Sequence, residues 1–143
     1  MERVRIRRVY DPIDPDDGAR VLVDRLWPRG MKKSALALDA WEKSLVPSAD
    51  LRRWFGHDVE RWPEFCRRYR AELGAAPEEA WARLLGYARR GRLTLLTATR
   101  DLEHSHAAVL RALLAAEQAE EAANGERASP VCFAPDEPGP DPD

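Results

Sequence analysis

The chain contains 143 residues, of which 44% are hydrophobic and 34% are charged, and its formal net charge is −2. This length has room for one domain with one hydrophobic core, and the composition is that of a globular protein. Two cysteines provide no disulfide framework, the N-terminal residues are charged, and no stretch approaches the roughly 20 apolar residues of a membrane helix. These features argue against a small secreted scaffold and a membrane protein, and they predict a cytoplasmic protein.

Charge and proline are distributed unevenly along the chain. Acidic residues dominate residues 117–143, where Arg127 is the single base, so the rest of the chain has an excess of Lys and Arg. Five of the eleven prolines also fall near the end, among few apolar residues. We therefore predict a folded domain over residues 1–120 and an acidic, proline-rich, disordered tail over residues 121–143. The basic body favours anionic partners, although its excess charge falls short of a nucleic-acid signature.

The first half of the chain predicts two strands and one helix. In residues 3–7, Val4 and Ile6 alternate with arginines, as in a strand with one buried face. Residues 21–23 are continuously apolar, which is typical of a central strand that is covered on both faces. A helix is predicted to start at Ser34, and three apolar residues form its buried stripe. These are Leu38, Trp41 and Leu45.

The second half predicts four more helices and a third strand. Four segments carry apolar residues three or four positions apart, as amphipathic helices do. They are residues 48–55, 62–73, 78–88 and the stretch from residue 107 onward. Pro63 falls in the first turn of the second segment, where proline is tolerated. A continuous apolar run at residues 93–98 predicts the strand.

Strands that alternate with helices predict an α/β fold with a small, partly parallel sheet of three or four strands flanked by helices. In such folds, ligands usually bind beyond the carboxyl ends of the strands. Residues that directly follow the predicted strands are therefore the first candidates for a functional site.

The segment Asp-Arg-Leu-Trp-Pro-Arg-Gly directly follows the second predicted strand. Its Arg25 and Arg29 carry planar guanidinium groups that match carboxylate or phosphate. Gly30 frees one backbone dihedral angle and the preceding proline fixes another, so the loop has a defined shape. Two interpretations are equally open: the loop binds an anion, or Asp24 pairs with an arginine and Trp27 fills the core.

A second polar segment, residues 97–101, ends the third strand and precedes a helix. A strand, a polar loop and a helix N-terminus in this order favour anions. Asp101 is also a typical helix cap, and His106 is a typical buried imidazole. We favour these structural roles over acid–base catalysis, which stays the alternative for both residues.

His57 and Asp58 form a third candidate, a base beside a carboxylate. Neighbours in sequence seldom turn their side chains toward each other, so a local turn is the favoured interpretation. The spacings of His57, His104, His106 and Cys66 match no standard zinc pattern, and no metal site is predicted. The chain also lacks the glycine-rich motifs of nucleotide sites and the Gly-x-Ser-x-Gly motif of hydrolases. The sequence therefore identifies no cofactor.

In these residues the chain resembles the DUF488 family, and within it the short YeaO-like branch. The longest matching run extends from Val21 to Gly30, and the resemblance spans about residues 5–114. The other matching stretches are residues 8–12, 18–20, 41–43, 47–48, 51–58, 65–73 and 93–96. Thr97 and Ser105 are departures, because the branch has Tyr and Asn there. The resemblance implies the fold and the choice of candidate residues, while the family carries no established reaction.

The leading hypothesis is that the domain binds a small anionic ligand in a basic pocket at the strand ends, and whether it is an enzyme stays open. Acid–base candidates are Asp24, His57, Asp101 and His106. Candidates for ligand binding are Arg25, Trp27, Arg29, Gly30, Lys43 and Arg52. The alternatives are a non-catalytic protein-interaction module with tryptophan-rich helices and, third, a nucleic-acid-associated protein. The oligomeric state is also left open.

Overall fold

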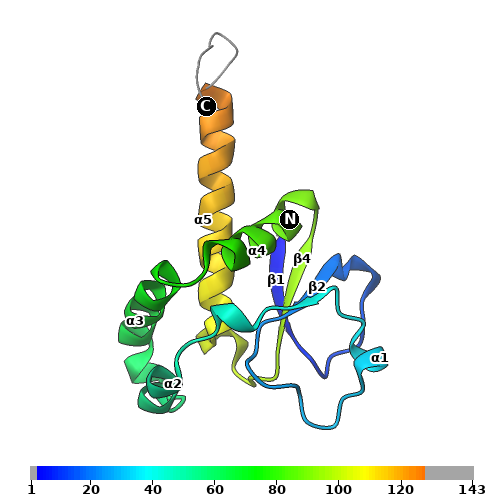
Figure 1. Ribbon diagram of the computed structural model, residues 1–143, viewed down its shortest axis with the longest axis vertical. Coiled ribbons are helices and arrows are strands. Elements are labelled where there is room, and N and C mark those ends of the chain that lie inside the picture. The colour runs from blue at the N-terminus through cyan, green and yellow to red at the C-terminus, as the bar shows by residue number, and fades with distance from the viewer. Residues whose placement is uncertain (1–2, 128–143) are drawn as a thin grey trace.

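The computed structural model describes residues 3–127, and its centre is a four-stranded sheet (Figure 1). The strands lie in the order β1-β4-β2-β3, and every neighbouring pair is parallel. Their bounds are Val4–Arg8 for β1, Ala19–Leu22 for β2, Ala40–Trp41 for β3 and Leu93–Thr97 for β4. The predicted α/β fold with a parallel sheet of three or four strands is confirmed.

Five α-helices are present in the described part of the chain. They are α1 (Lys33–Leu36), α2 (Ala49–Phe55), α3 (Trp62–Gly74), α4 (Glu78–Arg90) and α5 (His106–Arg127). In Figure 1, α2 to α5 lie on one side of the sheet and α1 lies on the other. The described residues also contain four short 3-10 helices: η1 (Pro15–Asp17), η2 (Lys43–Leu45), η3 (Val59–Arg61) and η4 (Leu102–His104). None of the helices between residues 3 and 127 has the length and apolarity to cross a membrane.

Both faces of the sheet are covered. Successive side chains of the central strand β4 point to opposite faces, and they are buried on both. Leu93 and Leu95 belong to the larger core cluster, which joins the sheet to the long helices. Leu96 belongs to a smaller cluster on the opposite face, together with Leu22 of β2 and Leu36 of α1. Val21 and Val23 belong to the larger cluster and Leu22 to the smaller one, so the prediction that residues 21–23 are covered on both faces is confirmed. Strands β2 and β4 are paired, which fixes their carboxyl ends side by side.

The predicted helix from Ser34 through Leu45 is wrong. Helix α1 ends at Leu36, because Ala37 adopts a left-handed conformation with φ of 48°. The chain then pairs with β2: the Asp39 carboxylate accepts from the Arg20 amide at 2.8 Å, and β3 follows. The expected apolar stripe is divided between the two faces of the sheet, with Trp41 in the smaller cluster and Leu45 in the larger one. Pairing of backbone groups with the sheet edge outweighs the local helical pattern.

A buried carboxylate ties the turn before β2 to the sheet. Asp17 is 1% exposed and forms ion pairs with Arg5, Arg7 and Arg20. Its backbone carbonyl also accepts from the Thr94 hydroxyl at 2.7 Å. Burial alone raises a carboxyl pKa, but the backbone amide of Asp14 and the arginines outweigh it, and the pKa of Asp17 falls to about 2. The next residue, Gly18, has φ of 66° and passes directly against a neighbouring backbone carbonyl.

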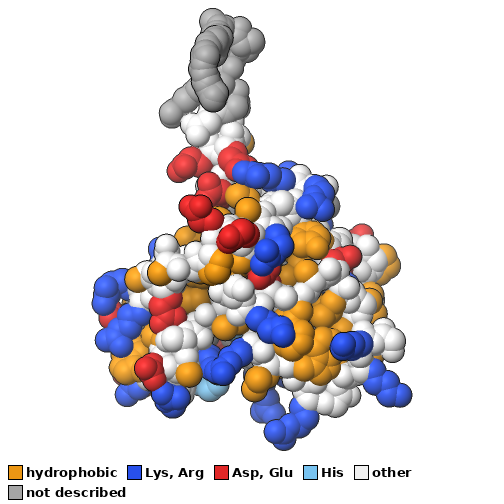
Figure 2. Space-filling model, viewed as in Figure 1, with side chains coloured by type: hydrophobic (Ala, Val, Ile, Leu, Met, Phe, Trp, Pro, Cys, Tyr) orange, Lys and Arg blue, Asp and Glu red, His pale blue; other side chains and the backbone are white. Residues whose placement is uncertain are grey.

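Helix α5 extends well past the sheet (Figure 1), and acidic side chains gather along it on the face shown in Figure 2. Lys and Arg side chains gather instead along the lower edge of the same view, which is the edge where β1 and β4 end. The helix continues through residues 121–127, beyond the predicted domain boundary. Residues 128–143 of the predicted acidic tail lie outside the described residues.

Candidate functional site

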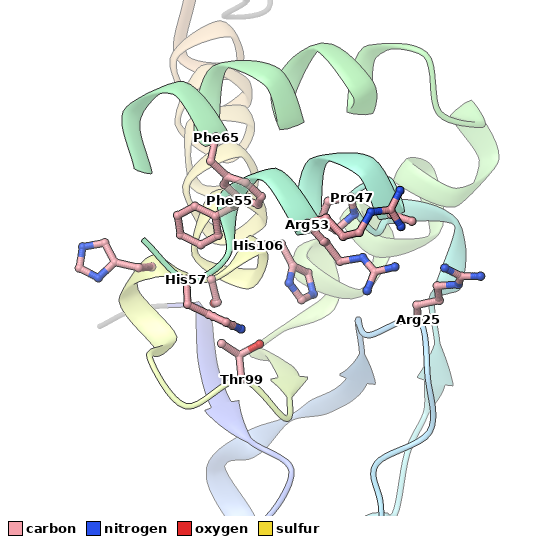
Figure 3. Close-up of a pocket in the computed structure, with 12 residues that line it drawn as sticks. Arg25, Pro47, Arg53, Phe55, His57, Phe65, Thr99 and His106 are labelled. Atoms are coloured by element: carbon pink, nitrogen blue, oxygen red, sulfur yellow. The ribbon is translucent and has the colours of Figure 1, made fainter. Parts of the chain in front are cut away.

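A cavity of about 510 Å³ lies at the carboxyl ends of β2 and β4, between these strand ends and helix α2 (Figure 3). Its walls come from the segments after β2 and β4, from α2 with its flanking residues, from Phe65 of α3 and from the region where η4 meets α5. The lining residues are Arg25, Pro47, Ala49, Arg52, Arg53, Phe55, His57, Phe65, Thr99, His104, Ser105 and His106. Its volume lies in the range of about 300–1,000 Å³ that is usual for small-molecule sites.

The polar lining is basic. Three arginines and all three histidines of the chain contribute to it, and none of the lining residues is an aspartate or glutamate. Arg53 forms an ion pair with Asp50 on the same exposed helix face, where solvent weakens such a pair. Arg25 and Arg52 form no ion pair with any residue between 3 and 124. Two guanidinium groups are therefore free to meet an anion.

Asp24 organises the floor of the cavity although it does not line it. Its carboxylate accepts from the Thr97 hydroxyl and from the Ala98 amide, both at 2.7 Å. The same carboxylate lies 3.2 Å from Nε2 of His106, which also contacts the Val23 carbonyl at 2.8 Å. The end of β2, the end of β4 and the first residue of α5 are thereby joined at one carboxylate.

The environment of Asp24 keeps this carboxylate charged. Burial acts to raise its pKa, but the hydrogen bond and the charge of His106 act in the opposite direction. The Ala98 amide and the Thr97 hydroxyl add to this effect, and the pKa of Asp24 lies below its ordinary value. Asp24 pairs with a histidine, so the arginine partner considered from the sequence is not the one it has.

Two histidines reach the cavity from neighbouring positions at the base of α5. Between them Ser105 is extended, with φ of −117° and ψ of 162°, and this geometry lets both His104 and His106 line the cavity. Asp101 caps η4 and contacts Nδ1 of His104 at 2.8 Å, a hydrogen bond that lowers the pKa of Asp101. Asp101 thus positions a cavity histidine while lying outside the lining.

His57 lines the opposite part of the cavity, just after α2. The helix ends at Gly56, and both Gly56 and His57 have positive φ, so the chain turns sharply there. Asp58 caps η3 by accepting from the Glu60 amide at 3.0 Å, and its carboxylate forms an ion pair with Arg61. The local-turn interpretation describes Asp58, while His57 lines the cavity as an exposed side chain.

Helix α3 positions α2, which carries Arg52 and Arg53. The amide and hydroxyl of Ser48, the N-cap of α2, donate to the Glu72 carboxylate at 2.8 and 2.6 Å. The Ser48 hydroxyl also accepts from the Leu51 amide at 3.1 Å. One turn earlier in α3, the buried Tyr69 hydroxyl donates to the Leu45 carbonyl. These bonds hold both ends of the segment that leads into α2.

The apolar side of the cavity is formed by buried aromatic rings. Phe55 and Phe65 are 6% and 2% exposed, and their ring centroids are 4.6 Å apart. Trp62 stacks on Phe65 at 5.5 Å and contacts His104 edge-on at 5.3 Å. In Figure 3, the Phe55 ring lies on one side of His106, and Arg25 and Arg53 lie on the other.

Four of the residues predicted to bind a ligand lie outside this lining. Trp27 donates to the Met31 carbonyl at 2.7 Å and packs edge-on against Trp41, so it anchors the loop. Lys43 lies over the Trp41 ring at 4.1 Å. Arg29 is exposed and its carbonyl accepts from the Tyr10 hydroxyl, and Gly30 has φ of 79° in the turn. Of the six, only Arg25 and Arg52 line the cavity.

Sequence reasoning did not select four other polar lining residues. They are Arg53, Thr99, His104 and Ser105. Arg53 and Ser105 are adjacent to the selected Arg52 and His106. No sequence pattern distinguishes an arginine that lines a cavity from one that faces solvent on the same short helix. In the described part of the chain, no cluster of three or more His, Cys, Asp or Glu residues could hold a metal ion.

Comparison with known proteins places these residues in a family. The sequence profile described as the inactive DUF488-N3 subclade matches residues 3–134. The uncharacterised protein Rv3073c of Mycobacterium tuberculosis H37Rv is 49% identical over 112 residues, which cover 78% of this chain and 93% of that protein. The uncharacterised protein YeaO of Escherichia coli K12 is 46% identical over 107 residues, which cover 75% of this chain and 92% of YeaO. No solved structure matches the chain significantly.

Proposed function

This chain belongs to the inactive DUF488-N3 subclade of the DUF488 family, and from that premise we propose that it binds a small anionic molecule without transforming it. The observation that carries the proposal is the lining of the strand-end cavity. Its titratable side chains are all basic, and the carboxylates that pair with His104 and His106, those of Asp101 and Asp24, lie outside the lining. Guanidinium groups in a partly enclosed site bind carboxylate or phosphate by charge-assisted hydrogen bonds.

Binding without catalysis accords with the description of the subclade and with the hydroxyl groups of the cavity. The Ser105 hydroxyl donates to the Leu102 carbonyl at 2.7 Å and is buried. The Thr99 hydroxyl lies 3.0 Å from the Thr97 hydroxyl. Neither hydroxyl is hydrogen-bonded to a histidine among the described residues, so the pairing that activates a nucleophile is not found there.

The alternative of nucleic-acid binding relies on arginine runs in the helices. Arg67 and Arg68 of α3 both pair with Glu64, and Arg89 of α4 pairs with Glu121. These pairs reduce the charge that the runs offer to phosphates. All five tryptophans are partly buried, which likewise gives the interaction-module alternative no distinctive surface. We therefore retain the anion pocket as the proposed function.

The test uses anilinonaphthalene sulfonate, an anion with an aromatic body whose fluorescence rises on binding. We expect the full chain to bind it at low salt, and to bind the uncharged phenylnaphthylamine more weakly. The double variant Arg25→Gln/Arg52→Gln loses two charge-assisted hydrogen bonds, which corresponds to a drop in affinity of at least about tenfold.

The matched control is Arg29→Gln/Lys43→Gln, which removes the same charge from residues outside the cavity. When both proteins are compared at about 0.15 M salt, where the Debye length is about 8 Å and long-range charge effects are screened, we expect the control to bind the probe within about twofold of the unchanged protein. Equal losses in both double variants, or no binding by the unchanged protein, would contradict the proposal. Circular dichroism of each variant checks that the fold is intact.

A further inference from the structure

We infer that the anion held in this cavity is a phosphate monoester whose organic part is flat and apolar. The inference rests on the proposed function, because it names the class of molecule that the same cavity binds. Three features carry it: the number of uncompensated cations, the different elements from which they reach the cavity, and the apolar side that faces them.

Carboxylates of the same chain accompany three of the basic side chains of the cavity, and the one beside Arg53 is exposed. The pairs are Asp24 with His106, Asp101 with His104, and Asp50 with Arg53. Arg25 and Arg52 have no such carboxylate among residues 3–124, so two permanent positive charges remain. Both arginines are exposed, so either can stay solvated without a partner. A ligand with two negative charges is favoured because it gains a charge-assisted interaction with each guanidinium group, whereas a monocarboxylate has one charge to offer to both.

The two guanidinium groups come from separate elements of the fold. Arg25 lies in the segment after β2, and its backbone is fixed by the Asp24 network and by Trp41, whose Nε1 donates to the Asp24 carbonyl at 2.6 Å. Arg52 belongs to α2, which Ser48 ties to α3. A carboxylate can accept from several guanidinium groups, as Asp17 does from three arginines, but it carries a single negative charge. A phosphate monoester above its second pKa carries about two negative charges on three terminal oxygens, so it offers one charge to each of the two guanidinium groups.

The apolar side of the cavity identifies the rest of the ligand. Phe55, Phe65, Pro47 and Ala49 line it without any hydrogen-bonding side chain. Figure 3 shows Phe55 and Phe65 on the far side of His106 from Arg25. The two rings are nearly buried, and together with Pro47 and Ala49 they form an apolar wall that an inorganic phosphate at the arginines would leave uncovered. A flat apolar group attached to the phosphate would pack on this wall and gain affinity from the apolar area that it removes from water.

Isothermal titration calorimetry of the full chain with four probes tests the inference. Phenyl phosphate combines the dianion and the ring, benzenesulfonate has a tetrahedral monoanion, benzoate has a planar monoanion, and inorganic phosphate lacks the ring. The titrations are run at about pH 7.5, above the second phosphate pKa of about 6. We expect phenyl phosphate to bind at least about tenfold more tightly than each of the others, and Arg25→Gln and Arg52→Gln each to weaken it about tenfold.

The remaining outcomes separate this inference from the proposed function. If benzoate or benzenesulfonate binds as tightly as phenyl phosphate, the inference that the ligand is a phosphate monoester is wrong, while the proposal that the cavity binds an anion is retained. If inorganic phosphate binds as tightly as phenyl phosphate, the inference that the ligand has a flat apolar part is wrong. If Arg29→Gln weakens phenyl phosphate as much as Arg25→Gln does, the probe binds outside the cavity and both proposals fail. Both also fail if none of the four anions binds.

Discussion

The Asp24 carboxylate and the His106 imidazole lie 3.2 Å apart and connect the end of β2 to the first residue of α5. Because the Ala98 amide and the Thr97 hydroxyl bond to the same carboxylate, the end of β4 is part of the connection. The cavity therefore has a floor in which the polar groups bond to one another. Arg25 is held by this network after β2, and Arg52 is held by the contacts of α2 with α3.

Replacing this carboxylate tests the role of the floor. Asp24→Asn turns one acceptor oxygen into an NH₂ group, which meets either the Ala98 amide or the pair formed by the Thr97 hydroxyl and His106 Nε2. In either orientation a partly buried donor loses its acceptor, and the charge opposite His106 is removed. We expect a loss of about 1–3 kcal/mol in the free energy of unfolding at neutral pH, measured by urea denaturation. Probe affinity should also fall, because the segment that carries Arg25 is released. The exposed Asp101→Asn serves as the control and should lose less stability.

Asp24 also gives this stability a pH dependence of known sign. Its pKa is lower in the folded protein than in the unfolded chain, so its contribution is complete above the ordinary pKa of about 4. The contribution disappears as the pH falls through the lower folded value. Unfolding curves of the unchanged protein and of Asp24→Asn should therefore converge in acid. Curves that remain separated by the same free energy at pH 7 and in acid would contradict this assignment.

Asp17 is expected to show a larger acid effect. Its pKa is about 2 in the folded protein against an ordinary 3.8, and this difference corresponds to about 2 kcal/mol of stability. The stability is present above about pH 4 and is lost as the pH falls toward 2. The measurement is a titration of the Asp17 carboxyl carbon by NMR, together with urea unfolding at each pH. A carboxyl group that titrates near 3.8 would show that the three arginines do not hold it ionised.

Gly18 and Gly30 provide a matched pair for the backbone. Both have positive φ, but a Cβ at Gly18 would lie 2.1 Å from the Arg92 carbonyl oxygen, whereas a Cβ at Gly30 would meet nothing within 4 Å. We expect Gly30→Ala to lose only the conformational strain of about 1 kcal/mol, and to keep its affinity for the anionic probe. Gly18→Ala should lose several times more free energy of unfolding, because the backbone near Arg92 has to move. Thermal unfolding measures the stability of both variants. Equal losses would show that the close approach at Gly18 relaxes without effect.

The sequence predicts the sheet well and the cavity only in part, for physical reasons that differ between residues. The strand at residues 21–23 was recognisable because its burial on both faces removes polar residues from it. The apolar spacing of residues 38–45 predicts a helix, but the structure has the short strand β3 there. The contact that favours the strand joins the Asp39 carboxylate to the Arg20 amide, and these residues are far apart in sequence. Local patterns cannot report such contacts.

The same limit applies to the candidate site. The position of Arg25 after a buried strand places it at the cavity, and this was predictable from topology. Arg29 occupies the same loop but lies between Trp27 and Met31, whose hydrogen bond closes the turn, and its side chain is exposed outside the cavity lining. His104 joins the cavity because Ser105 is extended, a backbone detail that residue types do not reveal. Placement of strand ends was thus predictable, while the direction of each side chain depended on local caps.

The tie between α2 and α3 gives the last prediction. Ser48→Ala removes the cap of α2 and one of two bonds to Glu72, so we expect a loss of about 1 kcal/mol in the free energy of unfolding. Because Arg52 is on this helix, the affinity for phenyl phosphate should fall as well, in calorimetry under conditions where the variant is fully folded. Ser44→Ala, at an exposed position in η2, is the control and should change neither quantity. If Ser48→Ala loses stability but keeps its affinity for phenyl phosphate, then packing on α3 is enough to position α2, and the hydrogen bonds of Ser48 only stabilise the helix.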